Sequence, residues 1–204
     1  MWAPIRLLMC ALAVLILTSC ATSPPKNTKN VCAIFDEKSG WYRDTRKASE
    51  RWGVPIPVIM AFMHQESRFK AKAKPPRKKY LGFIPGPRPS NAYGYTQALK
   101  GTWKHYKRSS GNYGADRDDF GDAADFIGWY NHQSFRRNKI QKTDIYRQYL
   151  AYHEGQGGYS RGSFNRKSWL LNTAKKVQRR AQRYETQLKR CEEDLNRSSF
   201  WPFS

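Results

Sequence analysis

The chain has 204 residues, with 37 Lys and Arg against 16 Asp and Glu, which gives a formal net charge of +21. Without the targeting segment described below, this length suffices for one domain of ordinary size. The charge predicts an anionic partner, which for most chains this basic is nucleic acid.

The first 19 residues are typical of a signal peptide. Arg6 supplies a short positive region, and residues 7–17 form an apolar stretch too short to span a bilayer. They lead into the sequence Leu17-Thr18-Ser19-Cys20-Ala21, which resembles the lipobox of bacterial lipoproteins. The resemblance implies cleavage before Cys20 and a lipid on that residue. The alternative is an ordinary secretory signal with a chance cysteine.

The residues after the lipobox predict where the mature chain is held. Ala21 stands where Asp would favour the inner membrane, so we expect the outer membrane of the cell envelope, on the side facing the periplasm. Residues 20–31 are rich in Ser, Thr, Pro, Lys and Asn and predict a lipidated flexible tether. A lipid anchors the chain without making it span the membrane.

Export excludes nucleic acid as the normal partner of this charge. The anionic partners outside the cytoplasm are phospholipid headgroups, phosphate-bearing polymers and the peptide carboxylates of the cell wall. Much of the charge lies in residues 70–79 and in the last predicted helix, which suggests contact with anionic envelope polymers. The alternative is that these Lys and Arg side chains form an ordinary solvated surface.

Hydrophobic periodicity and helix-end signals predict a mainly α-helical domain over residues 32–165. A helix over residues 44–52 precedes an apolar helix that is opened by Pro57 and carries Glu66 in its last turn. Residues 71–89 are rich in Pro and Gly and predict an extended loop with room for a short hairpin. Three more helices are expected over residues 95–109, over 119–137, and from Thr143 or Asp144 to about Glu154, where Gly155 supplies the stop.

The last segment, residues 166–204, predicts a long basic helix. Its apolar residues alternate four and three apart in a heptad stripe: Leu170, Ala174, Val177, Ala181, Tyr184, Leu188, Cys191 and Leu195. This stripe suits a coiled-coil dimer or a helix laid across its own domain, and the second, monomeric arrangement is preferred because Cys191 could then reach Cys32. In an oxidising compartment these two cysteines predict a disulfide, with two buried free thiols as the alternative.

Glu66 is the most informative residue of the chain. Ile59, Phe62 and Met63 precede it by seven, four and three residues, so all four share the buried face of one helix. Burial and the negative end of the helix dipole both disfavour the ionised carboxylate and raise its pKa. A carboxylic acid protonated near neutral pH suits general acid catalysis. The alternative is a Glu that reaches solvent from a frayed helix end.

Three short segments carry a family resemblance. They are Glu66-Ser67-Arg68-Phe69, Ala92-Tyr93-Gly94-Tyr95-Thr96-Gln97 and Ala151-Tyr152-His153-Glu154-Gly155. In order and context these resemble the motifs of the soluble (family 1) lytic transglycosylases, relatives of goose-type lysozyme that cut the glycan strands of peptidoglycan. The resemblance covers residues 52–159 and implies a lysozyme-like fold. It departs from the family where Tyr95 and Thr96 replace Leu and Met, and where His153 and Glu154 replace Asn and Ala.

The resemblance also implies roles for single residues. Glu66 matches the catalytic acid, and Ser67 matches its partner. On this basis Ser67, Gly94, Gln97 and Tyr152 are expected to bind the glycan. Apart from the resemblance, aromatic side chains stack on sugar faces, which predicts Tyr95 and Tyr130 as further glycan-binding residues and Tyr159 as another aromatic platform. For Tyr130 and Tyr159 an aromatic residue in or near the core is the alternative.

Glycoside hydrolysis normally uses two carboxylates, yet no Asp or Glu lies between Phe69 and Gly94. One acid suffices if the N-acetyl group of the cleaved sugar attacks its own anomeric carbon and the 6-hydroxyl then closes on that carbon. Glu66 would act first as acid and then as base, which gives a 1,6-anhydro-N-acetylmuramic acid end. Neither a cofactor nor a metal is expected in such a site.

Three other functions stay open. One is a zinc hydrolase built from His64, Glu66, His132, His153 and Glu154, although no His-Glu-x-x-His motif is present. Another is a catalytically inactive lipoprotein that binds peptidoglycan. The third is a lysozyme-type hydrolase in which Glu154 or an aspartate activates water.

Overall fold

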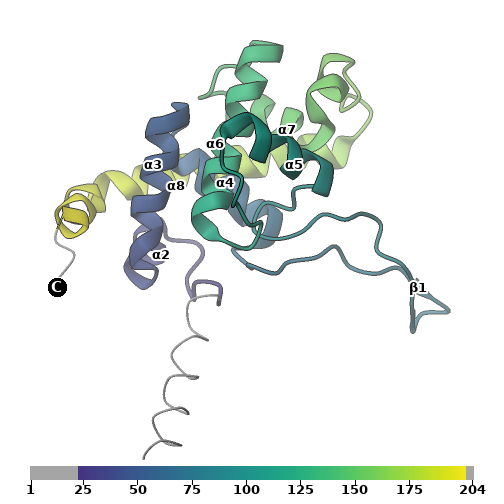
Figure 1. Cartoon of the computed structure of the whole chain (residues 1–204), viewed down its shortest axis with the longest axis horizontal. Helices are drawn as coiled ribbons and strands as arrows, with labels where there is room; N and C mark the ends of the chain where they lie inside the picture. Colours follow the sequence, from purple (N-terminus) through teal and green to yellow (C-terminus); the bar gives the residue numbers. More distant parts are fainter. Residues whose placement is uncertain (1–22, 201–204) are drawn as a thin grey trace, which may run out of the picture.

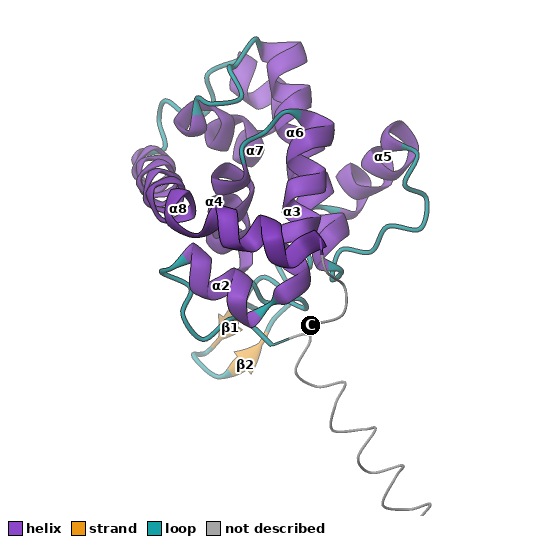
Figure 2. Cartoon of the chain, turned by 90° about the vertical axis from the view of Figure 1, so that its left-hand side faces the viewer, coloured by secondary structure: helices purple, strands orange, loops and turns teal. Residues whose placement is uncertain are grey.

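The computed structural model describes residues 23–200 and shows seven helices and one two-stranded hairpin in that part of the chain (Figures 1 and 2). The mainly helical, lysozyme-like fold expected from the sequence is confirmed. The elements are α2 (Val31–Glu37), α3 (Ser39–Trp52), α4 (Ile56–Ser67), β1 (Lys79–Tyr80), β2 (Ile84–Pro85), α5 (Lys100–Ser110), α6 (Phe120–Asn138), α7 (Ile145–Ser160) and α8 (Ser168–Phe200). The signal sequence and Cys20 lie outside the described residues. No helix among residues 23–200 is long and apolar enough to cross a membrane.

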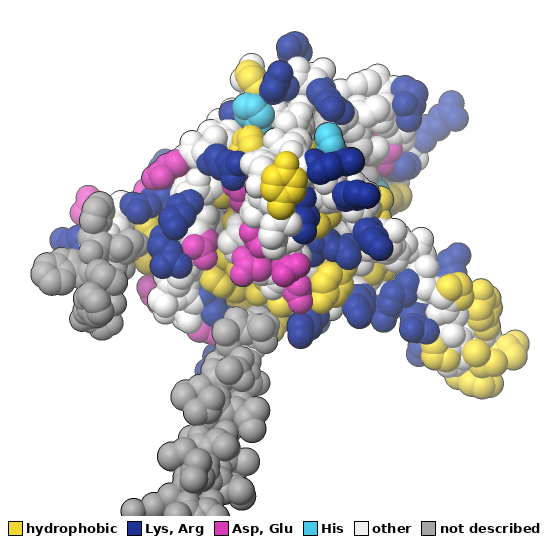
Figure 3. All heavy atoms as spheres, in the orientation of Figure 1, with side chains coloured by type: hydrophobic (Ala, Val, Ile, Leu, Met, Phe, Trp, Pro, Cys, Tyr) yellow, Lys and Arg dark blue, Asp and Glu magenta, His cyan; other side chains and the backbone are white. Residues whose placement is uncertain are grey.

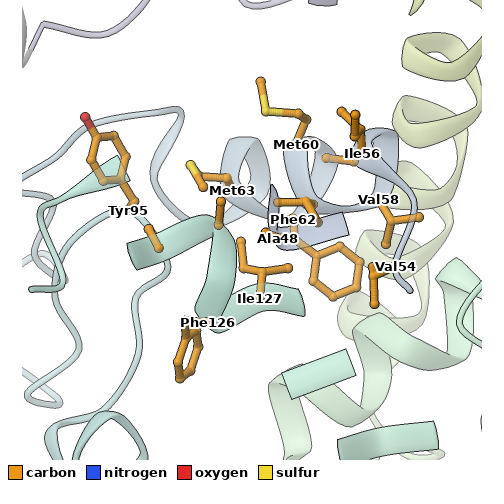
Figure 4. Close-up of a cluster of buried hydrophobic side chains, with 14 of the residues drawn as sticks. Ala48, Val54, Ile56, Val58, Met60, Phe62, Met63, Tyr95, Phe126 and Ile127 are labelled. Atoms are coloured by element: carbon orange, nitrogen blue, oxygen red, sulfur yellow. The ribbon is translucent and has the colours of Figure 1, made fainter. Parts of the chain in front are cut away.

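The core is built around α4. Every residue of α4 from Ile56 to Met63 is buried, and α3, α6 and α8 all pack against this helix. Figure 4 shows Phe62 and Met63 of α4 in the same apolar cluster as Phe126 and Ile127 of α6. A helix that is apolar on all faces is stable only when neighbours cover it on all sides. The packing of α4 therefore fixes where its last turn, with Glu66, is placed.

Two predicted helix starts differ from the structure. The first predicted helix, α3, begins at Ser39 and not at Asp44, because Trp41 and Tyr42 already bury their side chains in its first turn. The helix α2 before it was not predicted. The helix expected over residues 95–109 begins only at Lys100. Gly94 and Gln97 have φ values of 79° and 50°, and Tyr93 pairs with Ala98 as an isolated β-bridge. Left-handed backbone at two positions cannot continue a right-handed helix.

Gly155 interrupts α7 instead of ending it. Its backbone is non-helical, with φ 74° and ψ 161°, and helical turns resume and continue to Ser160. The predicted stop at Gly155 is therefore a kink. Only a residue without a Cβ adopts this positive φ at little cost. The predicted starts of the next two helices agree more closely with the structure. Asp119, predicted in the first turn of α6, instead caps this helix, and Asp144, one of two predicted caps, caps α7; both accept from backbone N–H groups.

The heptad stripe of α8 faces the chain's own domain. Leu170, Ala174, Val177, Ala181 and Tyr184 are all almost fully buried. The helix packs against α4, α7 and α2, and in Figure 1 it runs across the back of the molecule. A disulfide joins Cys32 of α2 to Cys191 of α8 across 159 positions of sequence. It ties the first described helix to the last.

Candidate active site

Glu66 lies in a groove assembled from four parts of the chain. The groove has a volume of about 390 Å³ and is lined by the end of α4, residues 92–102, α6 and α7. Its polar and aromatic lining includes Glu66, Gln97, Phe126, Tyr130, Tyr152 and Glu154. The three segments singled out in the sequence therefore all contribute to the lining of one groove.

The Glu66 carboxyl is held by a tyrosine and not by a cation. Tyr149 Oη donates a hydrogen bond to Glu66 Oε1 at 2.9 Å. Within residues 23–200 no Lys, Arg or His nitrogen lies within 4.0 Å of a Glu66 oxygen. Burial raises the pKa of Glu66 to about 7, and the hydrogen bond from Tyr149 opposes that rise. The carboxyl can therefore hold or release a proton near neutral pH.

Tyr149 is a site residue that the sequence analysis missed. It precedes Tyr152 by three positions in α7, so both side chains lie on one face of that helix, and both rings contact Phe62 edge-on. This i, i+3 spacing from a motif tyrosine was the available signal. Burial first, and the Glu66 charge second, raise the pKa of Tyr149 well above its ordinary value, so its hydroxyl stays a donor.

Three of the predicted glycan-binding residues line the groove: Gln97, Tyr130 and Tyr152. Tyr152 donates to the carbonyl oxygen of Thr96 at 2.8 Å, and Tyr130 contacts the Tyr152 ring edge-on with centroids 4.9 Å apart. The Gln97 amide donates to the carbonyl oxygens of Ala73 and Gly94 at 3.0 and 2.9 Å. These bonds fix the side chains in advance, which lowers the entropy lost when a ligand binds.

Tyr95 and Ser67 do not line the groove, and their predicted sugar contacts need correction. Tyr95 is 2% exposed and meets the rings of Trp41 and Phe120 edge-on in the core. The turn after Gly94 directs it inward. The hydroxyl of Ser67 donates to the carbonyl oxygen of Met63 at 3.2 Å, within its own helix. Tyr159, the further platform, stacks on Phe164 outside the groove.

Gly94 shapes the site without lining the groove. It has φ 79°, and a Cβ added there would lie 2.0 Å from the carbonyl oxygen of Arg117. We expect Gly94→Ala to lower the free energy of unfolding by more than about 2 kcal/mol, measured by chemical denaturation. Gly101→Ala is the matched control, since Gly101 lies in α5 with open space around its Cα, and alanine should match or slightly raise stability there. Equal stability of both variants would contradict this reading.

Glu154 also lines the groove, but its carboxylate already accepts hydrogen bonds from other side chains of the protein. Lys167 Nζ lies 2.7 and 2.9 Å from its two oxygens, and Ser163 and His153 bind the same group. Despite the opposing effect of burial, these bonds lower the pKa of Glu154 to about 2. Such a carboxylate is a weak base and does not hold a proton near neutral pH.

The aspartates considered as a second carboxylate have structural partners. Asp119 caps α6, Asp118 accepts from the Tyr93 hydroxyl, and Asp122 accepts from Asn112. Asp125 accepts from Trp52 and Tyr106 at 2.7 Å each. The histidines of the zinc alternative also stay apart: among residues 23–200, no three His, Cys, Asp or Glu side chains gather where they could hold a metal ion.

The fold and the groove define a lysozyme-like helical protein with one protonatable carboxyl among tyrosines. The sequence matches the family described as "Transglycosylase SLT domain" over residues 8–191, which is most of the chain. The protein therefore belongs to this family, and the membership supports transglycosylase-type cleavage of peptidoglycan. No curated protein matches the chain.

Proposed function

We propose that the protein is a peptidoglycan lytic transglycosylase that cleaves the β-1,4 bond between N-acetylmuramic acid and N-acetylglucosamine. The observation that carries the proposal is the Glu66 carboxyl, half-buried in the groove, with its pKa raised to about 7 and a neutral donor as its partner. A single group with this pKa can donate a proton in one step and accept one in the next.

In the first step, protonated Glu66 gives its proton to the bridging oxygen of the glycosidic bond. The carbonyl oxygen of the substrate's own N-acetyl group bonds to the anomeric carbon as the bridging oxygen leaves. Tyr149 remains hydrogen-bonded to the carboxyl, and its donor stabilises the carboxylate that this step creates.

In the second step, the Glu66 carboxylate accepts the proton of the 6-hydroxyl of N-acetylmuramic acid. The oxygen of that hydroxyl bonds to the anomeric carbon and displaces the N-acetyl oxygen, which gives the 1,6-anhydro end. Glu66 is protonated again, and no water is consumed. Tyr130 and Tyr152 supply aromatic faces for the sugar rings in the groove.

Digestion of purified peptidoglycan tests the proposal and its alternatives together. Anhydro-muropeptides without a reducible end would support the transglycosylase. Reducible ends would indicate the lysozyme-type hydrolase, and no products would indicate an inactive binding lipoprotein. Glu154→Gln should leave the products unchanged, because its carboxylate is engaged by Lys167 and Ser163. Loss of cleavage in that variant would favour the hydrolase.

Replacement of Tyr149 should change the pH profile of cleavage. Tyr149→Phe removes a bond that lowers the pKa of Glu66, so that pKa should rise above about 7. The alkaline limb of the pH–rate profile should move upward by about one pH unit. Tyr159→Phe, which changes a hydroxyl outside the groove, should leave the profile in place. If the alkaline limb of the pH–rate profile does not shift in Tyr149→Phe, Tyr149 does not set the pKa of Glu66.

We also propose that a lipid on Cys20 anchors the protein to the outer membrane, facing the periplasm. The support is the lipobox-like sequence alone. Mass spectrometry of the membrane fraction should find the lipid on Cys20 at the new N-terminus. Recovery of the intact signal sequence or of an unmodified Cys20 would contradict the proposal.

We further propose that the cationic surface of residues 70–79 and α8 holds the enzyme against anionic envelope polymers. The charge of these segments supports this proposal. Binding to purified sacculi should weaken steeply as salt rises, because exposed charges are screened over about 8 Å at physiological ionic strength. Binding that is indifferent to salt would contradict it.

A further inference from the structure

A second cavity lies at the end of α4, and its lining is cationic. It has a volume of about 320 Å³ and lies between residues 28–29, the last turn of α4 and α8. We call it the arginine pocket, and it is lined by Lys29, His64, Gln65, Arg68, Arg180 and Arg183. No Asp or Glu lines it. It is distinct from the groove, since no described residue lines both cavities: Glu66, Tyr130 and Tyr152 line the groove, whereas Tyr184 lines the arginine pocket.

The positive charges of the arginine pocket have no carboxylate partner in the part of the chain that the structure describes. Within residues 23–200 none of its three arginines has a carboxylate oxygen within 4.0 Å. Arg180 is half-buried, and its one hydrogen bond to a side chain goes to the neutral Gln65 amide at 3.4 Å. Like charges gathered in a partly buried cavity destabilise the empty state.

His64 lies beside these three arginines and is affected by their charge. Burial, and then the charges of Arg180, Arg68 and Arg183, lower its pKa to about 4. The imidazole is therefore neutral at physiological pH, and its buried Nδ1 has no hydrogen-bond partner among residues 23–200. Arg180 itself has a lowered pKa, for which burial is the first cause. A partly buried cavity with three guanidinium groups and one ammonium group in its lining is suited to an anion.

We propose that the arginine pocket binds a phosphate group. Three guanidinium groups and one ammonium group match a dianion better than the single charge of a carboxylate. Guanidinium groups also bind phosphate oxygens in pairs, with both hydrogen bonds strengthened by charge. The bound group would contact the tether end at Lys29, the last turn of α4 at His64, and α8 at Arg180.

Isothermal titration of the full chain with inorganic phosphate, at constant ionic strength, tests this site. Arg180→Gln should weaken binding about tenfold. Arg183→Gln should also weaken binding, and because Arg183 is exposed the fold should tolerate this change. Arg179→Gln is the matched control, since Arg179 precedes Arg180 in the same helix and does not line the pocket. It should leave the affinity unchanged.

Two further arms identify the source of the anion. Tighter binding of glycerol phosphate than of inorganic phosphate would indicate the phosphate ester of a lipid or polymer, and the reverse order would indicate free phosphate. Acetate should bind far more weakly, and tighter binding of acetate would instead indicate a peptide carboxylate and overturn the proposal. Equal loss of affinity in Arg180→Gln and Arg179→Gln would also overturn it, since only the general charge of the chain would then attract phosphate.

A different observation carries a second inference, which concerns the hairpin of β1 and β2. Figure 1 shows this hairpin at the end of a long arm that projects from the helical body. In Figure 3 its end is covered by apolar side chains. We call this end the apolar tip, and it consists of the exposed side chains of Tyr80, Leu81, Phe83 and Ile84.

Both the solvent exposure and the backbone conformation of the apolar tip are energetically unfavourable. Leu81 and Phe83 are 83% and 72% exposed. Leu81 and Gly82 form the centre of the turn with φ values of 51° and 79°, and Phe83 N–H donates to the carbonyl oxygen of Tyr80 at 3.2 Å. Asn or Gly adopts such left-handed backbone more readily than Leu does. The chain therefore keeps a large apolar side chain where both solvent and backbone disfavour it.

The arm behind the tip carries only positive charge. Residues 70–92 contain no Asp or Glu and seven cationic residues: Lys70, Lys72, Lys74, Arg77, Lys78, Lys79 and Arg88. All seven are exposed. Apolar side chains bordered by Lys and Arg suit the surface of an anionic bilayer, where the apolar groups enter the acyl boundary and the cations meet the headgroups.

We infer that the apolar tip inserts into an anionic phospholipid bilayer. An environment-sensitive dye placed by Phe83→Cys in the full chain tests this, with Cys10→Ser and Cys20→Ser removing the other reactive thiols and the lipid. On vesicles of phosphatidylethanolamine and phosphatidylglycerol the emission should shift to shorter wavelength, and a soluble quencher should lose access. A dye placed by Tyr113→Cys, at an exposed aromatic position outside the arm, should not respond.

The emission of the dye depends on the polarity around the tip. It therefore tests insertion of the tip even if the N-terminus also binds the vesicle. No shift on anionic vesicles would overturn the inference. A shift on purified sacculi but not on vesicles would overturn it in favour of wall binding. An equal shift on neutral phosphatidylcholine vesicles would contradict the role of the seven cations.

Discussion

Replacement of Glu66 by Gln should lower the rate of peptidoglycan cleavage by about three orders of magnitude or more. Glutamine keeps the size of the side chain and can still accept the hydrogen bond from Tyr149, but it cannot donate a proton to the bridging oxygen. The measurement is the release of soluble muropeptides from purified sacculi. Glu193→Gln, at an exposed position of α8, should cleave at the wild-type rate. Full activity of Glu66→Gln would show that another group supplies the acid.

The same substitution should change how stability depends on pH. The folded-state pKa of Glu66 is about 7, above the ordinary 4.5, so the folded protein binds the proton more tightly. The stability linked to this proton is complete below pH 4.5 and is lost as pH rises through 7. Between those values the wild type should lose at most about 3 kcal/mol relative to Glu66→Gln, and less where solvent screens the half-buried group. Denaturant unfolding at a series of pH values measures this difference.

Loss of the disulfide should have the largest effect on stability. The Cys32–Cys191 bond closes a loop spanning 159 positions. Removing it should lower the free energy of unfolding by about 5 kcal/mol, because the unfolded chain then regains the freedom of that loop. The variant is the double replacement Cys32→Ser and Cys191→Ser, and unfolding in denaturant is the measurement.

Reduction provides the internal control for this prediction. A reducing agent should lower the stability of the wild type to that of the double variant and leave the double variant unchanged. Equal stability of the wild type with and without reductant would show that the bond contributes nothing in solution. Packing of α8 on α4 and α7 would then suffice to hold the last helix.

Local signals predicted the parts of the site that lie within single helices. The stripe of Ile59, Phe62, Met63 and Glu66 placed the carboxyl correctly, because side chains three and four positions apart share one face of a helix. The predicted cap at Asp144 also depends on neighbours a few residues away. Residues 95–98 form part of a turn and not of the predicted helix, because distant contacts support the left-handed backbone there: Gly94 and Gln97 bond to Ala73, and Tyr95 N–H donates to Arg117.

The sequence by itself determined the helical class, the apolar stripes of α4 and α8, and the acid at the end of α4, since each follows from residues close together in the chain. Only the tertiary structure decided which tyrosines meet that acid. It brought Tyr149 to Glu66 across 83 positions and turned Tyr95 away into the core. It also engaged Glu154 with Lys167 and gathered Arg68, Arg180 and Arg183 around one cavity. These outcomes depend on how α4, α7 and α8 pack, and helix periodicity carries no information on the partner that each face meets.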